Sequence, residues 1–160
     1  MKKIINKIKI RESTINDCED ILRLIKQLEP QFTNDDIKIA EKIFKKIIDK
    51  ENYLNRVAIL SGEGDKKRVV GFISLSFKLT IHDLGLVATI NELVVDEYYR
   101  NIGVASFLLE NAIEEAKSCD CTEIEVSSSL ERKDAYSFYK KHNFEEVGKF
   151  FALKINNKIK

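Results

Sequence analysis

A short turn between an apolar stretch and an amphipathic stretch has the residue types and spacing of an anion-binding site. It consists of Arg100, Asn101, Ile102, Gly103, Val104 and Ala105. Residues 88–95 before it are rich in β-branched side chains and predict a strand, and apolar residues at helical spacing after it predict a helix. Such a turn leaves backbone N–H groups aimed at one point, where the helix dipole favours negative charge. Gly103 permits close approach and Ala105 stays small, so the turn suits a phosphate group or is an ordinary connection.

Glu92 is a carboxylate within the apolar strand predicted over residues 88–95. A carboxylate that is withdrawn from water acquires a raised pKa, which brings it toward the range of a general base near neutral pH. The alternative is that Glu92 faces solvent on the polar side of the sheet. The residue pattern leaves both interpretations open.

Around this turn, strand and helix patterns alternate without repeats or low-complexity linkers. Helix patterns follow a cap at Thr14 or Asn16 and begin again near Asn34, Val104 and Asp134, and Pro30 bars extension of the first. Strand patterns cover residues 4–11, 56–60, 69–80, 88–95, 122–128, 145–147 and 150–155. An antiparallel meander followed by a strand–helix–strand crossover predicts an α+β fold with a mixed, mostly antiparallel sheet of six to seven strands and about four helices.

Composition narrows the function classes. The 160 residues suit one domain over positions 1–160, and 27 basic against 26 acidic side chains give no field for nucleic acid. No stretch is long and apolar enough to span a membrane, and no signal peptide is recognised. Three cysteines without an export signal indicate reduced thiols and a cytoplasmic protein. With two histidines in the chain, the pair Cys119 and Cys121 does not predict a metal site.

Residues 90–151 resemble the GNAT superfamily of N-acetyltransferases, which use acetyl-coenzyme A. The resemblance rests on four motifs in the family's order: a strand, the turn at residues 100–105, the helix after it, and an aromatic helix that ends near a Gly-Phe pair. Here these motifs read Glu92-Leu93-Val94-Val95, Arg100 to Ala105, Leu108-Leu109, and Ala135-Tyr136-Ser137-Phe138-Tyr139 with Asn143-Phe144. Asn143 replaces the common glycine, and asparagine is the next-best residue for a left-handed helix end.

The resemblance implies roles for these positions. The backbone of Leu93, Val94 and Val95 would bind the pantetheine arm and the acetyl group, and residues 100–105 would bind the pyrophosphate. Glu92 would act as the base, commonly through water, and Tyr139 as the acid that protonates the leaving thiolate. The plain alternative for Tyr139 is a ring that packs on the sheet with its hydroxyl in water. His82 and Arg132 have no assigned role.

The sequence therefore predicts transfer of an acetyl group from acetyl-CoA, as cosubstrate and without a metal, to a primary amine of a small molecule or peptide in a ternary complex. Acidic residues near the expected acceptor site favour a cationic amine but do not select one; they are Glu29, Asp35, Asp36, Asp83 and Glu92. Neither membrane nor nucleic acid is an expected partner, and a homodimer stays open. The alternative is a CoA-binding sensor or partner-binding module without transferase activity, which would not need Glu92 or Tyr139.

Overall fold

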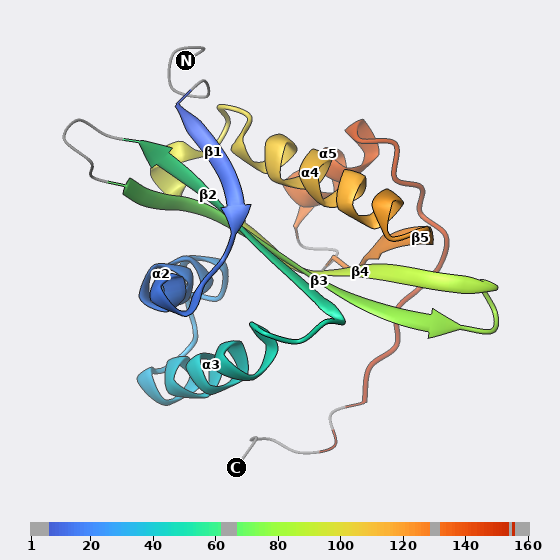
Figure 1. Cartoon of the computed structure of the whole chain (residues 1–160), viewed down its shortest axis with the longest axis horizontal. Coiled ribbons are helices and arrows are strands. Elements are labelled where there is room, and N and C mark those ends of the chain that lie inside the picture. The colour runs from blue at the N-terminus through green and yellow to red at the C-terminus, as the bar shows by residue number, and fades with distance from the viewer. Residues whose placement is uncertain (1–6, 62–66, 129–131, 154, 156–160) are drawn as a thin grey trace. The chain divides into compact units, whose positions relative to one another are not determined.

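Five strands form one sheet in which their spatial order is their order in the sequence (Figure 1). The computed structural model describes residues 7–61, 67–128, 132–153 and 155. The chain folds into two compact units, Met1–Glu125 and Val126–Lys160. The strands are β1 (Ile8–Glu12), β2 (Tyr53–Ser61), β3 (Lys67–Thr80), β4 (Gly85–Val95) and β5 (Cys121–Val126).

The sheet is mixed, as the sequence predicts. Strands β1 to β4 pair antiparallel, and β4 pairs with β3 from one end of β4 to the other, from Gly85 with Thr80 to Val95 with Gly71. Strand β5 runs parallel to β4, because its contacts advance in the same direction: the Thr122 hydroxyl donates to the Leu86 carbonyl at 3.2 Å, and the Thr89 hydroxyl donates to Glu125 at 2.7 Å. The mixed α+β fold class is therefore confirmed.

The strand count is lower than predicted. The described residues hold five strands rather than six to seven, and no strand is assigned within residues 144–153 or at Ile155. Side chains such as Phe150 and Phe151 are exposed there. An apolar stretch becomes a strand only beside a partner backbone, and composition does not specify that partner. The sequence pattern over residues 122–128 also favours a buried strand, and this expectation is wrong, since Thr122, Glu123 and Glu125 are exposed.

The helices are α2 (Cys18–Leu28), α3 (Asn34–Ile47), α4 (Val104–Ser118) and α5 (Lys133–Lys141), with short 3-10 turns η1 (Ile15–Asp17) and η2 (Glu97–Tyr99). The chain turns at Thr14 through a capping box with Asp17, as predicted. Helix α3 is capped by Thr33, whose hydroxyl accepts from the Asp36 amide at 3.2 Å. No helix within the described ranges is long and apolar enough to cross a membrane.

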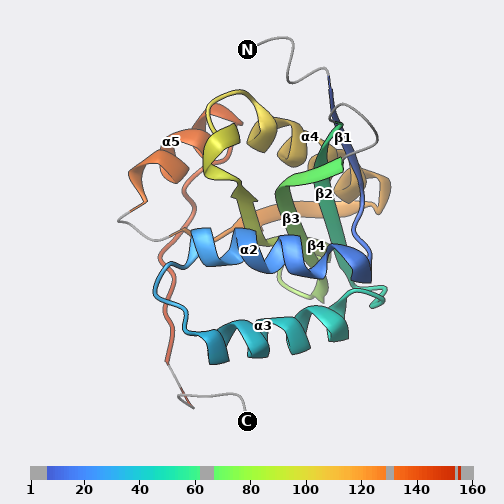
Figure 2. The same ribbon diagram turned by 90° about the vertical axis from the view of Figure 1, so that its left-hand side faces the viewer.

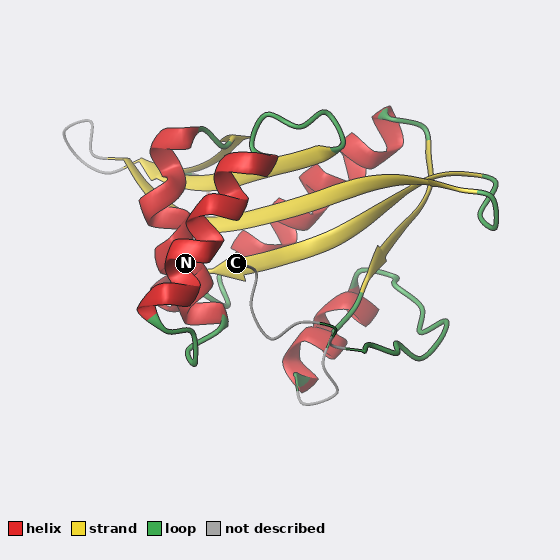
Figure 3. Cartoon of the chain, turned by 90° about the horizontal axis from the view of Figure 1, so that it is seen from below, coloured by secondary structure: helices red, strands yellow, loops and turns green. Residues whose placement is uncertain are grey.

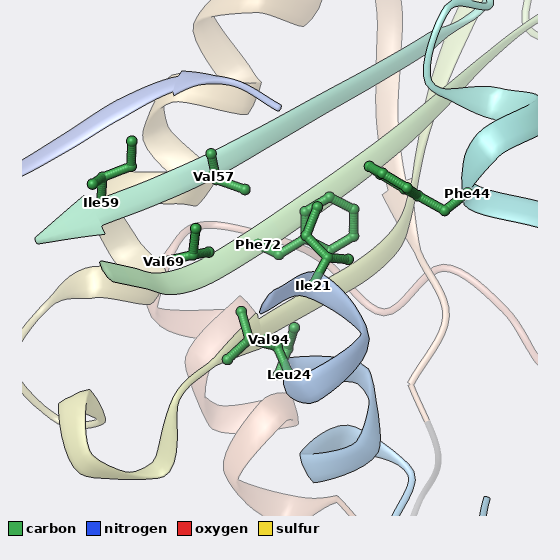
Figure 4. Packing of buried hydrophobic residues seen from close by; sticks show 8 residues of the cluster. All are labelled: Ile21, Leu24, Phe44, Val57, Ile59, Val69, Phe72 and Val94. Carbon is green, nitrogen blue, oxygen red and sulfur yellow. The ribbon is translucent and has the colours of Figure 1, made fainter. Parts of the chain in front are cut away.

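Helices α2 and α3 lie on one face of the sheet, and α4 lies on the other (Figures 2 and 3). On the α2–α3 face a cluster of buried side chains forms the core, with Phe44 and Phe72 in edge contact at 6.3 Å between ring centroids (Figure 4). The cluster comprises Ile21, Leu24, Phe44, Val57, Ile59, Val69, Phe72 and Val94.

On the α4 face the helix approaches the backbone of β3 closely at Gly71. A Cβ at this position would lie 2.9 Å from Leu108 Cδ1 and 3.2 Å from Val104 Cγ1. Glycine at this one position therefore sets how near the first turns of α4 can lie to the sheet.

Candidate active site

The predicted anion-binding turn links the end of β4 to the start of α4. Gly103 stands at the N-cap of α4 with φ of 99° and ψ of 0°, a left-handed conformation that favours glycine. Asn101 is also left-handed, with φ of 60°. The sequence analysis gave Asn101 no conformational role, although asparagine is the side chain that most readily joins glycine in this region.

The geometry of this turn leaves amides available for an anion. The helix begins at Val104, and the first hydrogen bond inside it runs from the Phe107 amide to the Gly103 carbonyl at 3.0 Å. The first-turn amides of Val104 and Ala105 have no acceptor inside the helix and point out of its N-terminal end. Arg100 donates from Nε to the Val95 carbonyl at 3.0 Å, which ties the turn to the end of β4.

Asp96 follows β4 and fixes the start of the turn through the contacts of its side chain. The sequence analysis did not identify Asp96 as a site residue. Its side chain is fully buried. Its carboxylate accepts from Arg23 Nη1 at 2.5 Å, from Arg68 Nη2 at 3.1 Å and from the Tyr98 amide at 3.1 Å. Burial alone would raise the pKa of Asp96, but the Tyr98 amide and the two arginines hold it below the usual value of 3.8. In the sequence, the one indication that Asp96 is a buried, paired carboxylate is its position directly after an apolar strand.

Glu92 lies opposite Ser74 in the β3–β4 ladder. The neighbouring pair along the same face is Phe72 and Val94, which both belong to the core cluster, so Glu92 shares the α2–α3 face. The side chain is partly buried, and burial raises the pKa of Glu92 while the Ser74 hydroxyl partly offsets this. A raised pKa is the direction that a general base near neutral pH requires.

A bulge in β4 decides which face Glu92 occupies. Ser74 pairs with Glu92, but the next residue of β3, Leu75, pairs with Ile90, so Asn91 is an extra residue in β4. The Ser76 hydroxyl donates to Asn91 Oδ1 at 3.1 Å. Without the extra residue Glu92 would share a face with Ile90, and the bulge places them on opposite faces.

The three predicted backbone contacts, Leu93, Val94 and Val95, lie beyond the reach of β5. The two contacts between these strands, Thr122 with Leu86 and Thr89 with Glu125, share one offset along the chain. At that offset Glu125, the last residue of β5 within the first unit, is level with Thr89. The outer edge of β4 from Leu93 to Val95 therefore extends past the end of its neighbour.

Tyr139 belongs to the second unit, in α5. Its ring packs against Phe138 at 5.2 Å and Phe144 at 5.3 Å between centroids. Burial raises the pKa of Tyr139 to about 12, against a weaker opposite effect of Arg132, so its hydroxyl stays protonated at neutral pH. Asn143, with φ of 65°, takes the left-handed position after the helix that the sequence indicates. The structure thus brings Glu92, residues 93–95 and residues 100–105 together in the first unit, whereas Tyr139 lies in the second.

Other candidate residues have local roles. His142 forms the C-cap of α5, and His82 is exposed in the turn between β3 and β4. Cys119 and Cys121 carry free thiols. Within the described parts of the chain, no three His, Cys, Asp or Glu side chains are grouped to hold a metal ion.

The first unit is thus a mixed sheet in which a left-handed glycine turn lies between a bulged strand and the N-terminus of a helix. Residues 21–144 match the acetyltransferase (GNAT) family, and the chain belongs to this family of N-acetyltransferases. It is similar to the aminoalkylphosphonate N-acetyltransferase of Salmonella typhimurium strain LT2, with 30% identity over 138 residues that make up 86% of this chain and 84% of that protein.

Two solved structures show the same fold. A transcriptional regulator from Bacillus halodurans C-125 is similar with a TM-score of 0.80 and 24% identity, over 92% of this chain and 99% of that one. The aminoglycoside 6'-N-acetyltransferase AAC(6')-Ih from Acinetobacter baumannii is similar with a TM-score of 0.75 and 18% identity, over 94% and 99%. At these identities the likeness concerns the fold.

Proposed function

We propose that this protein transfers the acetyl group of acetyl-CoA to a primary amine of a small molecule or peptide by direct attack in a ternary complex. The observation that carries the proposal is the left-handed turn at Gly103, which starts α4 directly after the strand that contains Glu92. A similar aminoglycoside N-acetyltransferase has been solved in complex with CoA, and again with a bisubstrate analogue that joins CoA to an acetylated aminoglycoside.

The first-turn amides of α4 and residues 100–105 are proposed to bind the pyrophosphate of acetyl-CoA. The outer edge of β4 at Leu93, Val94 and Val95 is proposed to bind the pantetheine arm and the acetyl carbonyl. Its support is that this edge continues past the end of β5, because strand amides and carbonyls without a neighbouring strand are fixed partners for an extended chain.

In the proposed chemistry, acyl transfer requires removal of a proton from the acceptor amine and addition of a proton to the leaving thiolate. Glu92 takes a proton from the acceptor ammonium, directly or through water, and the free amine attacks the thioester carbonyl. As the C–N bond forms and the C–S bond breaks, the departing thiolate takes a proton from Tyr139. The second proton of the attacking nitrogen leaves it as the amide forms and restores the Tyr139 hydroxyl through solvent, and Glu92 releases its own proton to solvent. The raised pKa values of both side chains keep Tyr139 protonated and make Glu92 a stronger base than a solvated carboxylate.

The acceptor is proposed to be a cationic amine, as aminoglycosides are. Four of the five acidic residues considered for binding it have local partners. Glu29 accepts from the Gln31 side chain, Asp36 caps α3, Asp35 contacts Lys38 at 3.2 Å, and Asp83 accepts from the Thr80 hydroxyl. Their positions are explained without an acceptor. Glu92 is thereby left as the carboxylate on which the proposal depends.

Two further points complete the proposal. Residues 1–160 are taken as one acetyltransferase domain, because the family match from residue 21 to 144 crosses the boundary between the two units. A cytoplasmic location is proposed because Cys18, Cys119 and Cys121 all carry free thiols.

The test is thiol release from acetyl-CoA in the presence of a panel of amines that includes an aminoalkylphosphonate and an aminoglycoside. We expect release with at least one amine, and we expect Glu92→Gln to remove the acidic limb of the pH profile of kcat/KM. Glu97→Gln is the matched control, since Glu97 is an exposed carboxylate five residues further on. CoA binding without thiol release for any amine would favour the non-enzymatic binding module instead.

A further inference from the structure

Three polar residues form one row across the middle of the sheet. Asn55 of β2 pairs with Ser74 of β3, and Ser74 pairs with Glu92 of β4. Residues in register on adjacent strands point to the same face, with Cβ atoms about 4.5–5.5 Å apart. The three side chains therefore stand side by side, with Ser74 in the centre.

This row lies on the apolar α2–α3 face. The neighbouring row on this face, two positions away on each strand, consists of core-cluster members: Val57, Phe72 and Val94 (Figure 4). On this side the row borders aliphatic and aromatic side chains, which offer no hydrogen bonds; on its other side Ser76 follows Ser74 along β3.

Two oxygen atoms of the row lack partners. Ser74 is fully buried and Asn55 is 4% exposed. Among the described residues, Ser74 Oγ and Asn55 Oδ1 have no partner in full hydrogen-bond geometry, although the Ser74 hydroxyl is near enough to the Glu92 carboxylate to lower the pKa of Glu92. Buried polar atoms without partners are rare and unfavourable, and a hydroxyl can rotate to reach a neighbour on either side. Because both oxygens are inaccessible, they act on substrate only through Glu92.

We propose that Ser74 and Asn55 are positioning residues that form a hydrogen-bond relay behind Glu92, an inference that rests on the proposed function. When Glu92 is ionised, the Ser74 hydroxyl donates to its carboxylate. When Glu92 has taken the proton of the acceptor amine, its carboxyl O–H donates to Ser74 Oγ, and the Ser74 hydroxyl turns to donate to Asn55 Oδ1. No proton leaves the row in this exchange; the proton gained by Glu92 is later returned to solvent.

The charged groups on the elements packed against this face are engaged elsewhere. On α2, Arg23 binds Asp96 and Asp20. On α3, Glu41 and Lys45 pair with each other at the surface. Cys18 of α2 packs against the core cluster, and Glu125 of β5 accepts from Thr89. The other charged side chains of the two helices include five that are exposed to solvent: Glu19, Lys26, Lys38, Lys42 and Lys46. Burial and the Ser74 hydroxyl are the influences that set the pKa of Glu92 among the described residues.

The relay predicts pH shifts of opposite sign. Ser74→Ala removes the charge-assisted hydrogen bond to the ionised carboxylate, so the acidic limb of kcat/KM should move up by about one pH unit. Asn55→Leu keeps the side-chain size but removes the acceptor that serves the protonated state, so the limb should move down. Ser118→Ala is the control, because the Ser118 hydroxyl donates to the Glu114 carbonyl in α4, on the opposite face of the sheet.

The experiment measures kcat/KM by thiol release across pH for these variants, with Glu92→Gln in parallel and a thermal melt of each. Ser74→Cys, a nearly isosteric weak donor, replaces Ser74→Ala if the latter does not fold, and should shift the limb in the same direction by less. If Glu92→Gln removes the limb but Ser74 and Asn55 variants leave it in place or shift it the same way, the relay is wrong and the proposed function stands. If Glu92→Gln retains the limb, the base assignment fails, and the relay fails with it.

Discussion

Replacing Asp96 by asparagine should destabilise the fold far more than the same change at Asp20, although both carboxylates bind Arg23. Asparagine keeps the size of the side chain and can still accept from the Tyr98 amide. It removes two charge-assisted hydrogen bonds, from Arg23 at 2.5 Å and Arg68 at 3.1 Å, at a carboxylate that is fully buried. Such bonds contribute roughly 1.5–3 kcal/mol each. Because the arginine side chains are 33% and 50% exposed, the lower end applies, and the loss should be about 3 kcal/mol.

Asp20 supplies the matched control. It lies 3.0 Å from Arg23 on the same helix and is 44% exposed, so Asp20→Asn should change the free energy of unfolding by about 0–1 kcal/mol. Urea unfolding of both variants and the wild type at neutral pH measures the difference. Equal effects of the two substitutions would show that the ion pairs of Asp96 with Arg23 and Arg68 do not stabilise the end of β4.

The pH dependence gives a second check on Asp96. Its folded pKa lies below the usual value of 3.8, so its contribution to stability is present above that pH and is lost as pH falls through the folded value. The gap in unfolding free energy between wild type and Asp96→Asn should be constant from about pH 5 to 7 and should close in more acidic solution. A gap that persists at a pH below the folded pKa would contradict the electrostatic explanation.

Three further predictions concern the turn, the helix behind it and the second unit. Gly103→Val should weaken CoA binding in calorimetry, because a β-branched residue at φ of 99° is strained by about 1–3 kcal/mol. Gly103→Asn should bind CoA more nearly like wild type, since asparagine tolerates this conformation. If Gly103→Val binds CoA as tightly as wild type, Gly103 is not part of the binding site. Gly71→Ala should lower the free energy of unfolding by about 1–3 kcal/mol, and by clearly less in a Leu108→Ala background, where the atom 2.9 Å from the new Cβ is gone; additive effects in the double variant would rule out this contact. Tyr139→Phe should lower kcat roughly 100- to 10,000-fold with little change in acetyl-CoA affinity, and wild-type turnover would leave the ring with a packing role alone.

The predictions that the structure confirms rest on patterns of residues that are close together in the sequence. The β-branched run before residue 100, the glycine at Gly103 and the asparagine at Asn143 each specify the conformation of their own segment, and each lies where expected. The mixed sheet also follows, because a meander and a crossover are defined by neighbouring elements. These features depend on few residues that are close together in the chain.

Features that depend on distant residues could not be predicted in this way. The extra residue Asn91 is visible only once β3 lies beside β4, and it alone decides which face Glu92 occupies. The burial of Asp96 depends on Arg23, which is 73 positions away in the sequence. The strands predicted over 145–147 and 150–155 failed for the related reason that a strand requires a partner. The apolar composition of these segments indicates a tendency to form strands, but a strand forms only where a second strand pairs with it.

The sequential order of the five strands has a consequence for how the chain reaches this fold. Each strand joins the sheet beside the one that precedes it, so the sheet grows at a single advancing edge and never inserts a strand between two that are already paired. The β3–β4 hairpin closes a short loop and should form early, whereas joining β1 to β2 closes the segment that holds α2 and α3. During synthesis on the ribosome, β4 therefore presents an open edge until α4 and β5 have emerged. That interval is when the nascent chain is most exposed to pairing with another copy of itself.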